Sequence, residues 1–594
     1  MTDPTPPLQE ATPTERLQQF LAGLPLFAGL PTEILLELCM QAERLTLPGG
    51  TILFEQDDPS DALYVLYWGR LAAWRRGPEG EIRKLGHIAP GGYVGETGLL
   101  LEQERTASVI ALRDSELLRW SKASFMQLMG QFPAAMLRLA REALARYART
   151  VDRPAQARCF ALLPGVAGLD VAGFAQRLAR ALDTVGSFRI VYATQARERG
   201  PSWFTRLEQQ SDGLIYVGDL DPAWRERCAR QSDAVLTLVD ADADPRTALL
   251  APANLSEHTP QHLLLLQHGQ APNTGTGAWL EAFPNIGMHH HVRTDHDLER
   301  VARLLGGRAI GLVLSGGGAR GFAHVGALRV LREAGVKIDY VAGCSAGAII
   351  AAGIANGWDD AHLVDALRAA FVEDNPFSDV TLPLVALHRG RKASTLLQQA
   401  FGETYIEDLP TPFFCVSTDL TEGTLRIHER GPLWLALRAS TAIPGVVPPV
   451  FHDHRVLVDG GVIDNLPVSE LRRRVGGDII AVDVGGNYRI ETDLEEHALP
   501  SWWRQILRQS GNKRYPGIAQ LLWRAVMVNS DATTAHQRRQ SSLLLKPDLG
   551  GIDLFDWKRF DEIVELGHAQ ARQHLAAIKA LFGSPGQGAG KPGA

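Results

Sequence analysis

Ser345 stands in the middle of residues 343–347, whose sequence Gly-Cys-Ser-Ala-Gly fits the pattern G-x-S-x-G. The apolar run 338–342 precedes it and a stretch of small residues follows it, which predicts a strand, a sharp turn and a helix. A serine on such a turn is exposed for nucleophilic attack, and Gly343 and Gly347 leave room where a Cβ atom would crowd the backbone. We therefore predict Ser345 as a nucleophile, with Gly343 and Gly347 forming its elbow.

A second glycine-rich turn, formed by Gly316, Gly317 and Gly318, precedes this elbow in the chain. Ile310–Leu314 predicts a strand before the turn, and the periodicity of 319–333 predicts a helix after it. Backbone N–H groups at such a turn can bind the negative charge that develops on an ester oxygen during acyl transfer. We expect these three glycines to form an oxyanion hole, with Arg320 adding positive charge.

The same turn also fits a different class of site. Gly316, Gly318 and Gly321 match the G-x-G-x-x-G pattern of dinucleotide-binding folds, and Asp339 lies near the distance expected for a ribose-binding acid. In that interpretation the acid should close the second strand. Asp339 instead opens a strand that continues into the serine elbow, which favours a hydrolase.

The best candidate for the base is Asp459, at the end of the apolar strand pattern in 456–461 (VLVDGG). The two glycines after it allow other backbone to approach closely. A carboxylate with the ordinary pKa near 3.9 is a weak base for a serine hydroxyl, so a dry pocket must raise its basicity. A triad with one of the histidines His324, His452 or His454 is the chemical alternative.

Four motifs in this order resemble the patatin-like phospholipase family over about residues 310–570. They are GGGARG at 316–321, the serine elbow, STAIPG at 440–445 with two prolines at 448–449, and DGG at 459–461. The resemblance implies a dyad of Ser345 and Asp459 without histidine, and an oxyanion hole at the 316–318 turn. It also implies cleavage of carboxylic acyl esters of phospholipids or lysophospholipids.

The N-terminal part is rich in short strand patterns, at 51–54, 62–67, 70–74 and 81–87, with turn residues between them. Within this predicted β-roll, Gly95 and Glu96 are followed by Arg105 and Thr106, an arrangement that resembles the phosphate-binding cassette of cyclic nucleotide-binding domains. The resemblance implies that these four residues contact cAMP or cGMP. With the C-terminal motifs, it points to the neuropathy target esterase branch of patatin-like proteins and to lysophospholipase activity.

The fold class that we predict is multidomain α/β. A disordered tail (1–15) precedes the cyclic nucleotide-binding-like β-roll (16–153). A parallel, Rossmann-like α/β linker domain (155–306), the patatin-like hydrolase domain (307–582) and a second disordered tail (583–594) complete the chain. The middle segment lacks G-x-x-x-x-G-K-[ST], so we expect no nucleotide there. The run 289–291 of three histidines is expected on a surface strand, and we predict no metal site and no required cofactor.

Composition excludes several other functions. The 594 residues carry a net charge of −7, which argues against nucleic-acid binding. Five scattered cysteines and the lack of an export signal favour a cytoplasmic protein. No apolar window is long enough to span a membrane. Residues 498–545 instead interleave tryptophans with cations, which predicts either peripheral contact with the inner face of the membrane or packing against the catalytic domain; these are Trp502, Trp503, Arg504, Arg508, Lys513, Arg514, Trp523 and Arg524.

Two functions from different classes therefore stay open. The first is a serine lipid hydrolase whose N-terminal domain binds a cyclic nucleotide as an allosteric ligand. The second is a nucleotide-responsive regulatory or binding protein with an inert hydrolase domain. The presence of the nucleophile, the base and the glycine turn together favours the hydrolase.

Overall fold

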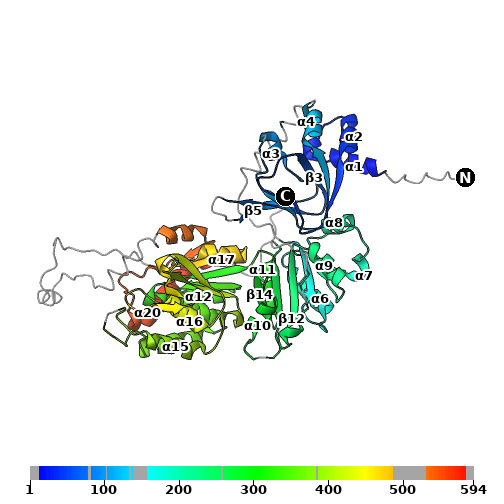
Figure 1. Cartoon of the computed structure of the whole chain (residues 1–594). Helices are drawn as coiled ribbons and strands as arrows, with labels where there is room; N and C mark the ends of the chain where they lie inside the picture. The colour runs from blue at the N-terminus through cyan, green and yellow to red at the C-terminus, as the bar shows by residue number, and fades with distance from the viewer. Residues whose placement is uncertain are drawn as a thin grey trace, which may run out of the picture. The chain divides into compact units, whose positions relative to one another are not determined.

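The computed structural model describes residues 12–77, 82–101, 103–130, 132, 137, 157–249, 251–252, 255, 259–269, 271–382, 385–485, 530 and 532–582 (Figure 1). The chain divides into two compact units. The first contains Met1–Leu266 and Ala282–Met288, and the second contains Gln267–Glu281 and His289–Ala594. Among the described helices, none is both long enough and apolar enough to cross a bilayer. Each of the five cysteines is a buried free thiol.

The first unit begins with a β-roll, as predicted. Two four-stranded antiparallel sheets have the strand orders β1-β8-β3-β6 and β2-β7-β4-β5. The elements are α1 (Pro13–Ala22), η1 (Pro25–Phe27), α2 (Thr32–Gln41), β1 (Glu43–Leu47), β2 (Ile52–Phe54), β3 (Ala62–Trp68), β4 (Leu71–Arg76), β5 (Ile82–Ile88), β6 (Tyr93–Val94), α3 (Glu96–Leu101), β7 (Ser108–Ala111), β8 (Ser115–Ser121) and α4 (Lys122–Gly130).

The disorder predicted for residues 1–15 is wrong from residue 13 onward, because helix α1 begins at Pro13. Thr12 and Glu15 form a capping box, in which each side chain accepts a hydrogen bond from the other residue's backbone N–H. Proline at the first helical position adds a pre-set φ angle. Residues 1–11 and 583–594 lie outside the described residues.

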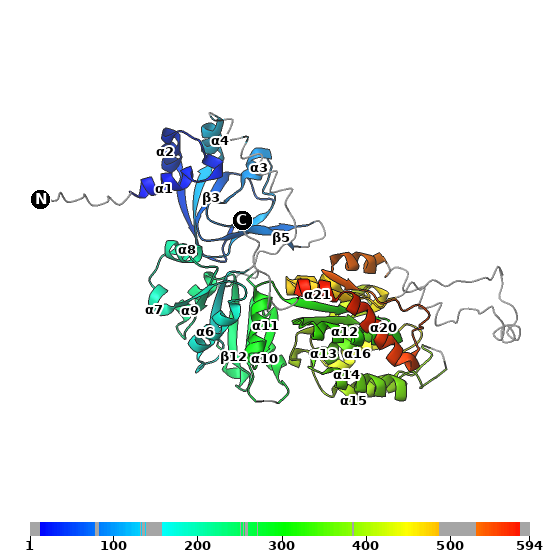
Figure 2. The same ribbon diagram turned by 180° about the vertical axis from the view of Figure 1, so that it is seen from behind.

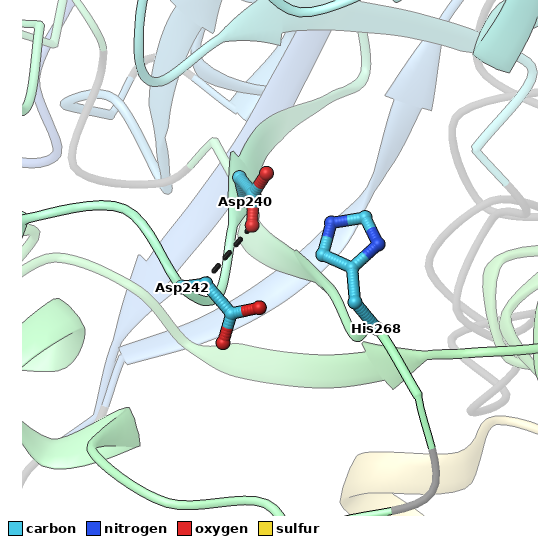
Figure 3. A group of neighbouring side chains, drawn as sticks. All are labelled: Asp240, Asp242 and His268. Atoms are coloured by element: carbon cyan, nitrogen blue, oxygen red, sulfur yellow. Dashed lines mark hydrogen bonds between the residues drawn. The ribbon is translucent and has the colours of Figure 1, made fainter.

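A parallel sheet follows in the same unit, in agreement with the predicted α/β class. Strands β10, β11, β9, β12 and β13 lie in that order. The elements are β9 (Cys159–Pro164), α6 (Val171–Leu182), β10 (Phe188–Tyr192), α7 (Ala193–Ala196), α8 (Pro201–Gln209), β11 (Gly213–Val217), α9 (Pro222–Arg230), β12 (Ala234–Asp240), η2 (Pro245–Thr247) and β13 (Gln261–Leu266). Strand β12 ends in a tight turn, where the Asp242 N–H donates to the Asp240 carboxylate over 3.0 Å (Figure 3).

A buried ion network joins the β-roll to this sheet within the first unit. The guanidinium of Arg113, which is 1% exposed, donates to Asp233 over 2.7 Å, and Arg70 donates to the same carboxylate over 3.3 Å. The backbone N–H groups of Arg158 and Cys159 complete its shell at 2.7 and 3.0 Å. These partners hold the pKa of Asp233 well below its usual range, although burial opposes them. The carboxylate is therefore charged and fully hydrogen-bonded.

The second unit contains the serine and glycine turns. Its sheet has the order β19-β20-β17-β16-β15-β21-β22, with β18 paired to β17. The elements are α10 (Thr276–Ala282), β14 (Met288–Val292), α11 (Asp295–Leu305), β15 (Ile310–Leu314), η3 (Gly318–Phe322), α12 (Ala323–Glu333), β16 (Tyr340–Cys344), α13 (Ala346–Ala355), α14 (Asp360–Leu367), η4 (Arg368–Glu373), α15 (Arg391–Phe401), η5 (Ile406–Asp408), β17 (Phe413–Asp419), β18 (Thr424–His428), α16 (Leu433–Ser440), β19 (Val450–His452), β20 (Arg455–Asp459), η6 (Gly460–Val462), α17 (Val468–Val475), β21 (Asp478–Val482), β22 (Leu543–Leu545), η7 (Trp557–Arg559), α20 (Phe560–Gln573) and α21 (Leu575–Phe582).

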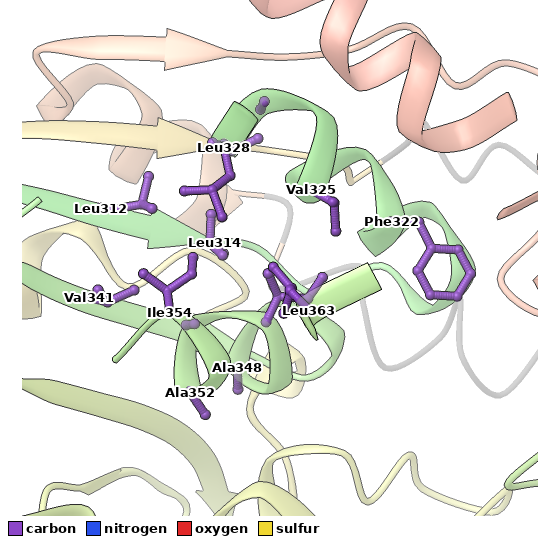
Figure 4. Close-up of a cluster of buried hydrophobic side chains, with 14 of the residues drawn as sticks. Leu312, Leu314, Phe322, Val325, Leu328, Val341, Ala348, Ala352, Ile354 and Leu363 are labelled. Atoms are coloured by element: carbon purple, nitrogen blue, oxygen red, sulfur yellow. The ribbon is translucent and has the colours of Figure 1, made fainter. Parts of the chain in front are cut away.

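The core of this unit fixes the strands that carry the site. Leu312 and Leu314 of β15 lie near Leu328 of α12 and Ile354 of α13 in one buried cluster (Figure 4). Helices α12 and α20 lie side by side (Figure 2), and glycines make the close approach possible. A Cβ atom on Gly326 would lie 2.0 Å from the Val564 carbonyl oxygen of the facing helix. The two glycine turns thus follow strands that are held in place by this buried packing.

The three-histidine run does not lie on a surface strand, so that prediction is wrong. In β14, His290 and His291 are buried. The Nε2 atoms of His289 and His291 lie 2.8 and 2.9 Å from the Glu407 carbonyl oxygen, which can only accept a hydrogen bond. Burial lowers the pKa of both, to about 4 and about 3, so both rings are neutral at pH 7. His289 and His291 are two residues apart, so their side chains lie on the same face of the strand. Both can therefore contact Glu407 in η5.

Candidate active site

Ser345 sits on a strained turn between β16 and α13. Its φ of 52° and ψ of −125° lie in a region that residues other than glycine seldom adopt. A Cβ atom on Gly347 would lie 2.4 Å from the Leu314 carbonyl oxygen, and one on Gly343 would lie 2.6 Å from the Gly347 carbonyl oxygen. The Ser345 N–H donates to the Ser440 hydroxyl over 2.9 Å. Both flanking glycines and this hydrogen bond hold the elbow in its unusual conformation.

Sheet order brings Asp459 to this turn. Cys344 of β16 is paired with Val416 of β17, and the next residue along β17, Ser417, is paired with Asp459 of β20. The Asp459 side chain is fully buried, and its Oδ1 accepts from the Gly461 N–H over 2.8 Å. Oδ2 has no hydrogen-bond partner of regular geometry among the described residues.

The environment of Asp459 makes it a better base than an ordinary aspartate. Burial raises the pKa of its carboxyl to about 6, although hydrogen bonding by the Ser345 hydroxyl and the Gly461 N–H acts in the opposite direction. The Ser345 hydroxyl thus lies near enough to lower the pKa of the Asp459 carboxyl. The Oδ2 atom of Asp459 can still accept a better-aligned hydrogen bond from that hydroxyl. Catalytic hydrogen bonds are commonly loose before substrate binds.

The glycine turn packs directly against the nucleophile. A Cβ atom on Gly316 would lie 2.9 Å from Ser345 Cβ, and one on Gly318, whose φ is +56°, would lie 2.3 Å from the Leu554 carbonyl oxygen. The N–H groups of Gly317 and Gly318 donate no hydrogen bond to any described residue. Arg320 Nε donates to the Ile552 carbonyl oxygen over 2.7 Å, which anchors the turn. The charge role expected for Arg320 stays a prediction.

Asp339 has a structural partner that accounts for it. It is fully buried, forms a two-pronged ion pair with Arg303 at 2.7 to 3.1 Å, and accepts from the Ile310 N–H over 3.0 Å. These contacts tie α11 to the start of β15. They leave the dinucleotide interpretation of the glycine turn without its acid.

Asn465 is a site residue that the sequence did not reveal. Its side-chain N–H donates to the Gly316 carbonyl oxygen over 3.1 Å. Helix α17 begins only at Val468 and has no side-chain cap, so neither Asp464 nor Asn465 caps it. Asp464 instead accepts from the Leu466 N–H at 3.0 Å and from Gln537 at 2.7 Å. The only sequence signal for Asn465 is its place a few residues after the DGG motif.

The candidate triad histidines have other places. His324 is buried, and its Nε2 lies 2.8 Å from the Ser315 carbonyl oxygen, which fixes the start of the glycine turn. Burial lowers its pKa to about 4. His452 is the last residue of β19 and His454 lies on the turn that follows, and both are exposed. Within the described ranges, no histidine forms a hydrogen bond with Ser345 or Asp459.

A pocket of about 890 Å³, including its open mouth, begins at Ser345. It follows α13 along Ala346 and Ile349 as far as Trp358, and helix α15 closes another side. Apart from Ser345 and Thr441, its lining is apolar; the residues are Gly318, Ser345, Ala346, Ile349, Trp358, Ala366, Leu367, Ala370, Phe371, Pro376, Phe377, Ala393, Leu396, Leu397, Ala400, Phe401, Thr441, Ile443, Val447, Leu554, Phe555 and Trp557. Such a lining accommodates a hydrocarbon chain.

Two of the four predicted nucleotide contacts, Gly95 and Arg105, touch each other in the first unit. Gly95, with φ +91°, precedes α3, and Arg105 Nη1 donates to its carbonyl oxygen over 3.3 Å. The Arg105 guanidinium is buried, forms an ion pair with Asp61 at 3.0 Å and lies 4.2 Å from the centre of the Phe54 ring. Glu96 is 7% exposed at the start of the same helix. Thr106 follows Arg105 and is half-buried.

Comparison with known proteins adds three domain matches. Residues 312–472 match the patatin-like phospholipase model, 44–132 match the cyclic nucleotide-binding domain, and 156–306 match the Neuropathy Target Esterase family P-loop like domain. An uncharacterized NTE family protein of Mycobacterium tuberculosis is 31% identical over 577 residues, which cover 94% of this chain and 96% of that protein. The chain belongs to the neuropathy target esterase (NTE) family.

This membership confirms the family resemblance, the fold class and the enzyme class of patatin-like phospholipase. The NTE-family chain is also 26% identical to Lysophospholipase NTE1 of Coccidioides immitis, over 93% of this chain but only 41% of that protein. A solved cyclic nucleotide-binding domain from Methylobacillus flagellatus is 22% identical over 24% of this chain and 81% of its own, with a TM-score of 0.22. The middle domain carries a P-loop-like name in this family although its sequence has no G-x-x-x-x-G-K-[ST] motif.

Proposed function

We propose that this protein hydrolyses carboxylic acyl esters of lysophospholipids and phospholipids through a dyad of Ser345 and Asp459. The observation that carries the proposal is the position of Ser345 on a strained elbow beside a buried carboxylate whose pKa is raised to about 6. A carboxylate of that basicity is half-protonated near pH 6 and can accept a proton at neutral pH. No histidine is needed in this scheme.

The reaction follows from these positions. Asp459 Oδ2 takes the hydroxyl proton as Ser345 Oγ attacks the ester carbonyl carbon, and the carbonyl oxygen becomes the oxyanion. The N–H groups of Gly317 and Gly318 donate to that oxyanion. Collapse of the tetrahedral intermediate breaks the bond to the glycerol oxygen, which leaves with the proton from Asp459. Water then attacks the acyl-serine, gives its proton to Asp459, and releases the fatty acid as Ser345 recovers its hydroxyl.

The pocket supports a substrate with a long hydrocarbon chain. Its lining offers almost no polar groups beyond Ser345, so a polar substrate would lose hydrogen bonds with water on entering. One acyl chain can lie along α13 with its ester at the elbow and its head group outside. The name of the Coccidioides immitis relative, Lysophospholipase NTE1, supports a single-chain phospholipid substrate in particular.

The direct test compares wild type with Ser345→Ala and Asp459→Asn on lysophosphatidylcholine. We expect each variant to lose about 10³-fold or more in kcat, because residues of a catalytic unit act together. Ser541→Ala is a matched control and should leave the rate unchanged, since among the described residues the Ser541 hydroxyl bonds only the Arg538 carbonyl oxygen. Equal background rates for wild type and Ser345→Ala would instead support the regulatory protein with an inert hydrolase domain.

A cyclic nucleotide is the second ligand that we propose, held by Gly95, Glu96, Arg105 and Thr106. The buried guanidinium of Arg105 beside the start of α3 supports binding of a cyclic phosphate. Titration with cAMP and cGMP should raise the melting temperature of wild type but not of Arg105→Gln. A wild-type protein that neither nucleotide stabilises would remove this ligand while leaving the hydrolase intact.

A further inference from the structure

A loop whose described residues are 374–382 and 385–390 lies between η4 and α15, beside the pocket. At its base the Thr381 N–H donates to the Leu387 carbonyl oxygen over 3.0 Å, and the Arg389 backbone N–H donates to the Asp379 carbonyl oxygen over 2.9 Å. Further along, the Leu387 N–H donates to the Gly445 carbonyl oxygen over 3.0 Å. The loop is therefore fastened to the segment 443–447, of which Ile443 and Val447 line the pocket.

Three aliphatic side chains of this loop are turned to solvent. Val380 is 68% exposed, Leu382 is 80% exposed and Val385 is 64% exposed. We call them the exposed aliphatic set. Large apolar side chains gathered on one short loop, rather than scattered singly, mark a surface that meets an apolar partner.

The exposed aliphatic set lies next in the chain to a residue that lines the pocket. Phe377, just before the loop, lines the pocket, and its ring centre lies 5.4 Å from that of Phe555. Phe555 lines the pocket as well and is 42% exposed, so the pocket opens beside it. A hydrocarbon chain leaving a surface that the loop touches would thus meet apolar side chains all the way to Ser345.

Two cations follow the loop. Arg389 ends it and Arg391 begins α15, and both are exposed. Neither guanidinium has an ion-pair partner in the part of the chain that the structure describes. Apolar side chains flanked by unpaired arginines suit the boundary of an anionic bilayer, where the former enter the acyl layer and the latter meet head groups.

We propose that the exposed aliphatic set docks this unit on an anionic lipid bilayer, with Arg389 and Arg391 at the level of the head groups. The choice of a bilayer rests on the proposed function, because the acyl substrate resides in membranes and the docked surface is continuous with its pocket. The surface differs from the tryptophan-rich segment 498–545, most of which lies outside the described residues.

The experiment uses the full-length double variant Leu382→Asp/Val385→Asp and co-sedimentation with vesicles of phosphatidylglycerol and phosphatidylcholine. We expect bound protein to fall by about tenfold or more, since each side chain loses its burial in the acyl layer. Arg389→Gln/Arg391→Gln should weaken binding to these vesicles but not to pure phosphatidylcholine. Leu420→Asp is the control, because Leu420 is also exposed (53%) but follows β17, away from the loop in sequence.

Hydrolysis of p-nitrophenyl butyrate in solution separates docking from chemistry. The aspartate double variant should keep its rate on this soluble ester within twofold and lose rate only on vesicle-borne lysophosphatidylcholine. Ser345→Ala should bind vesicles like wild type and hydrolyse neither ester. Vesicle binding by the double variant equal to wild type would overturn the proposal, as would an equal loss in Leu420→Asp. So would a double variant that turns a dimer into a monomer without losing vesicle binding, which would assign the loop to a second copy of the chain.

Discussion

The side-chain amide of Asn465 donates a hydrogen bond to the carbonyl oxygen of Gly316 over 3.1 Å, across 149 positions of sequence. The Gly316 N–H returns a longer one, 3.4 Å, to the Asn465 carbonyl oxygen. Asn465 follows Asp459 by six residues. The segment that contains the proposed base therefore also holds the glycine turn whose N–H groups we propose as oxyanion donors.

Removing this link should slow the chemical step. In Asn465→Ala the glycine turn loses its side-chain tether, so we expect kcat to fall by about tenfold to 10²-fold, less than for loss of a direct oxyanion donor. KM for a soluble ester should change little, because Asn465 does not line the pocket. Asn273→Ala, which removes a buried amide bonded to the Asp408 carbonyl oxygen, should leave kcat unchanged. A rise in KM with constant kcat would contradict a positioning role.

The pH dependence of kcat/KM should report Asp459. Only the ionised carboxylate can accept the serine proton, and burial raises its pKa to about 6 in the free enzyme. The rate should therefore increase tenfold per pH unit well below pH 6 and level off above it. Asp464, whose pKa burial also raises to about 6, takes no part in proton transfer in our scheme, so Asp464→Asn should preserve this limb. If the acidic limb of the pH profile vanished in Asp464→Asn but persisted in Asp459→Asn, the titrating group would be Asp464, which would contradict this prediction.

Asp459→Asn should also make the protein more stable at neutral pH. The folded-state pKa is raised above that of the unfolded chain, so the stability contributed by this group is greatest at low pH and is lost as pH rises toward about 6. A shift of that size corresponds to roughly 2–3 kcal/mol, which the uncharged amide would restore. Urea denaturation at pH 7.5 and pH 4 checks this, because the gain should largely disappear at pH 4. A variant destabilised at pH 7.5 would contradict it.

The far end of the pocket should set acyl-chain preference. Trp358 and Phe401 stack there with ring centres 4.9 Å apart and planes 7° from parallel. The Trp358 ring lies against Gly353, which is about 12 Å along α13 from Ser345. Trp358→Ala should shift the optimum of kcat/KM to longer chains, since each newly accommodated CH₂ contributes about fourfold. A lysophosphatidylcholine series measures this, and an unchanged optimum with a uniformly lower rate would contradict it.

The sequence locates the reacting groups because their local geometry needs particular residues. Gly343 and Gly347 are required by backbone contacts of 2.6 and 2.4 Å, and this spacing is visible in one dimension. Asp459 is visible because its strand pattern ends at DGG. The distance between Asp459 and Ser345 cannot be read from the sequence, since it depends on the strand order β16-β17-β20. Family resemblance supplies that pairing.

The contacts that sequence analysis missed are long-range hydrogen bonds. Asn465 contacts the glycine turn from a distant segment, and nothing in its neighbouring residues signals it. Ser440 lies in the STAIPG motif, but the motif does not show that its hydroxyl accepts from the Ser345 N–H. The error at 289–291 has the same origin. Three histidines look polar enough for a surface, but the Glu407 carbonyl oxygen satisfies two of them inside the fold. Local sequence patterns predict helices and strands, whereas the hydrogen-bond partners of a side chain depend on which distant segments the fold brings together.

In the proposed mechanism, Asp459 activates Ser345 as the nucleophile. Treating the full chain with a fluorophosphonate ester and locating the adduct by peptide mass spectrometry tests it most directly. We predict one phosphonylated residue, Ser345, with labelling slowed by at least about 10²-fold in Asp459→Asn but not in His452→Asn or His454→Asn. An adduct on another residue, or a labelling rate that depends on one of these histidines and not on Asp459, would contradict the account.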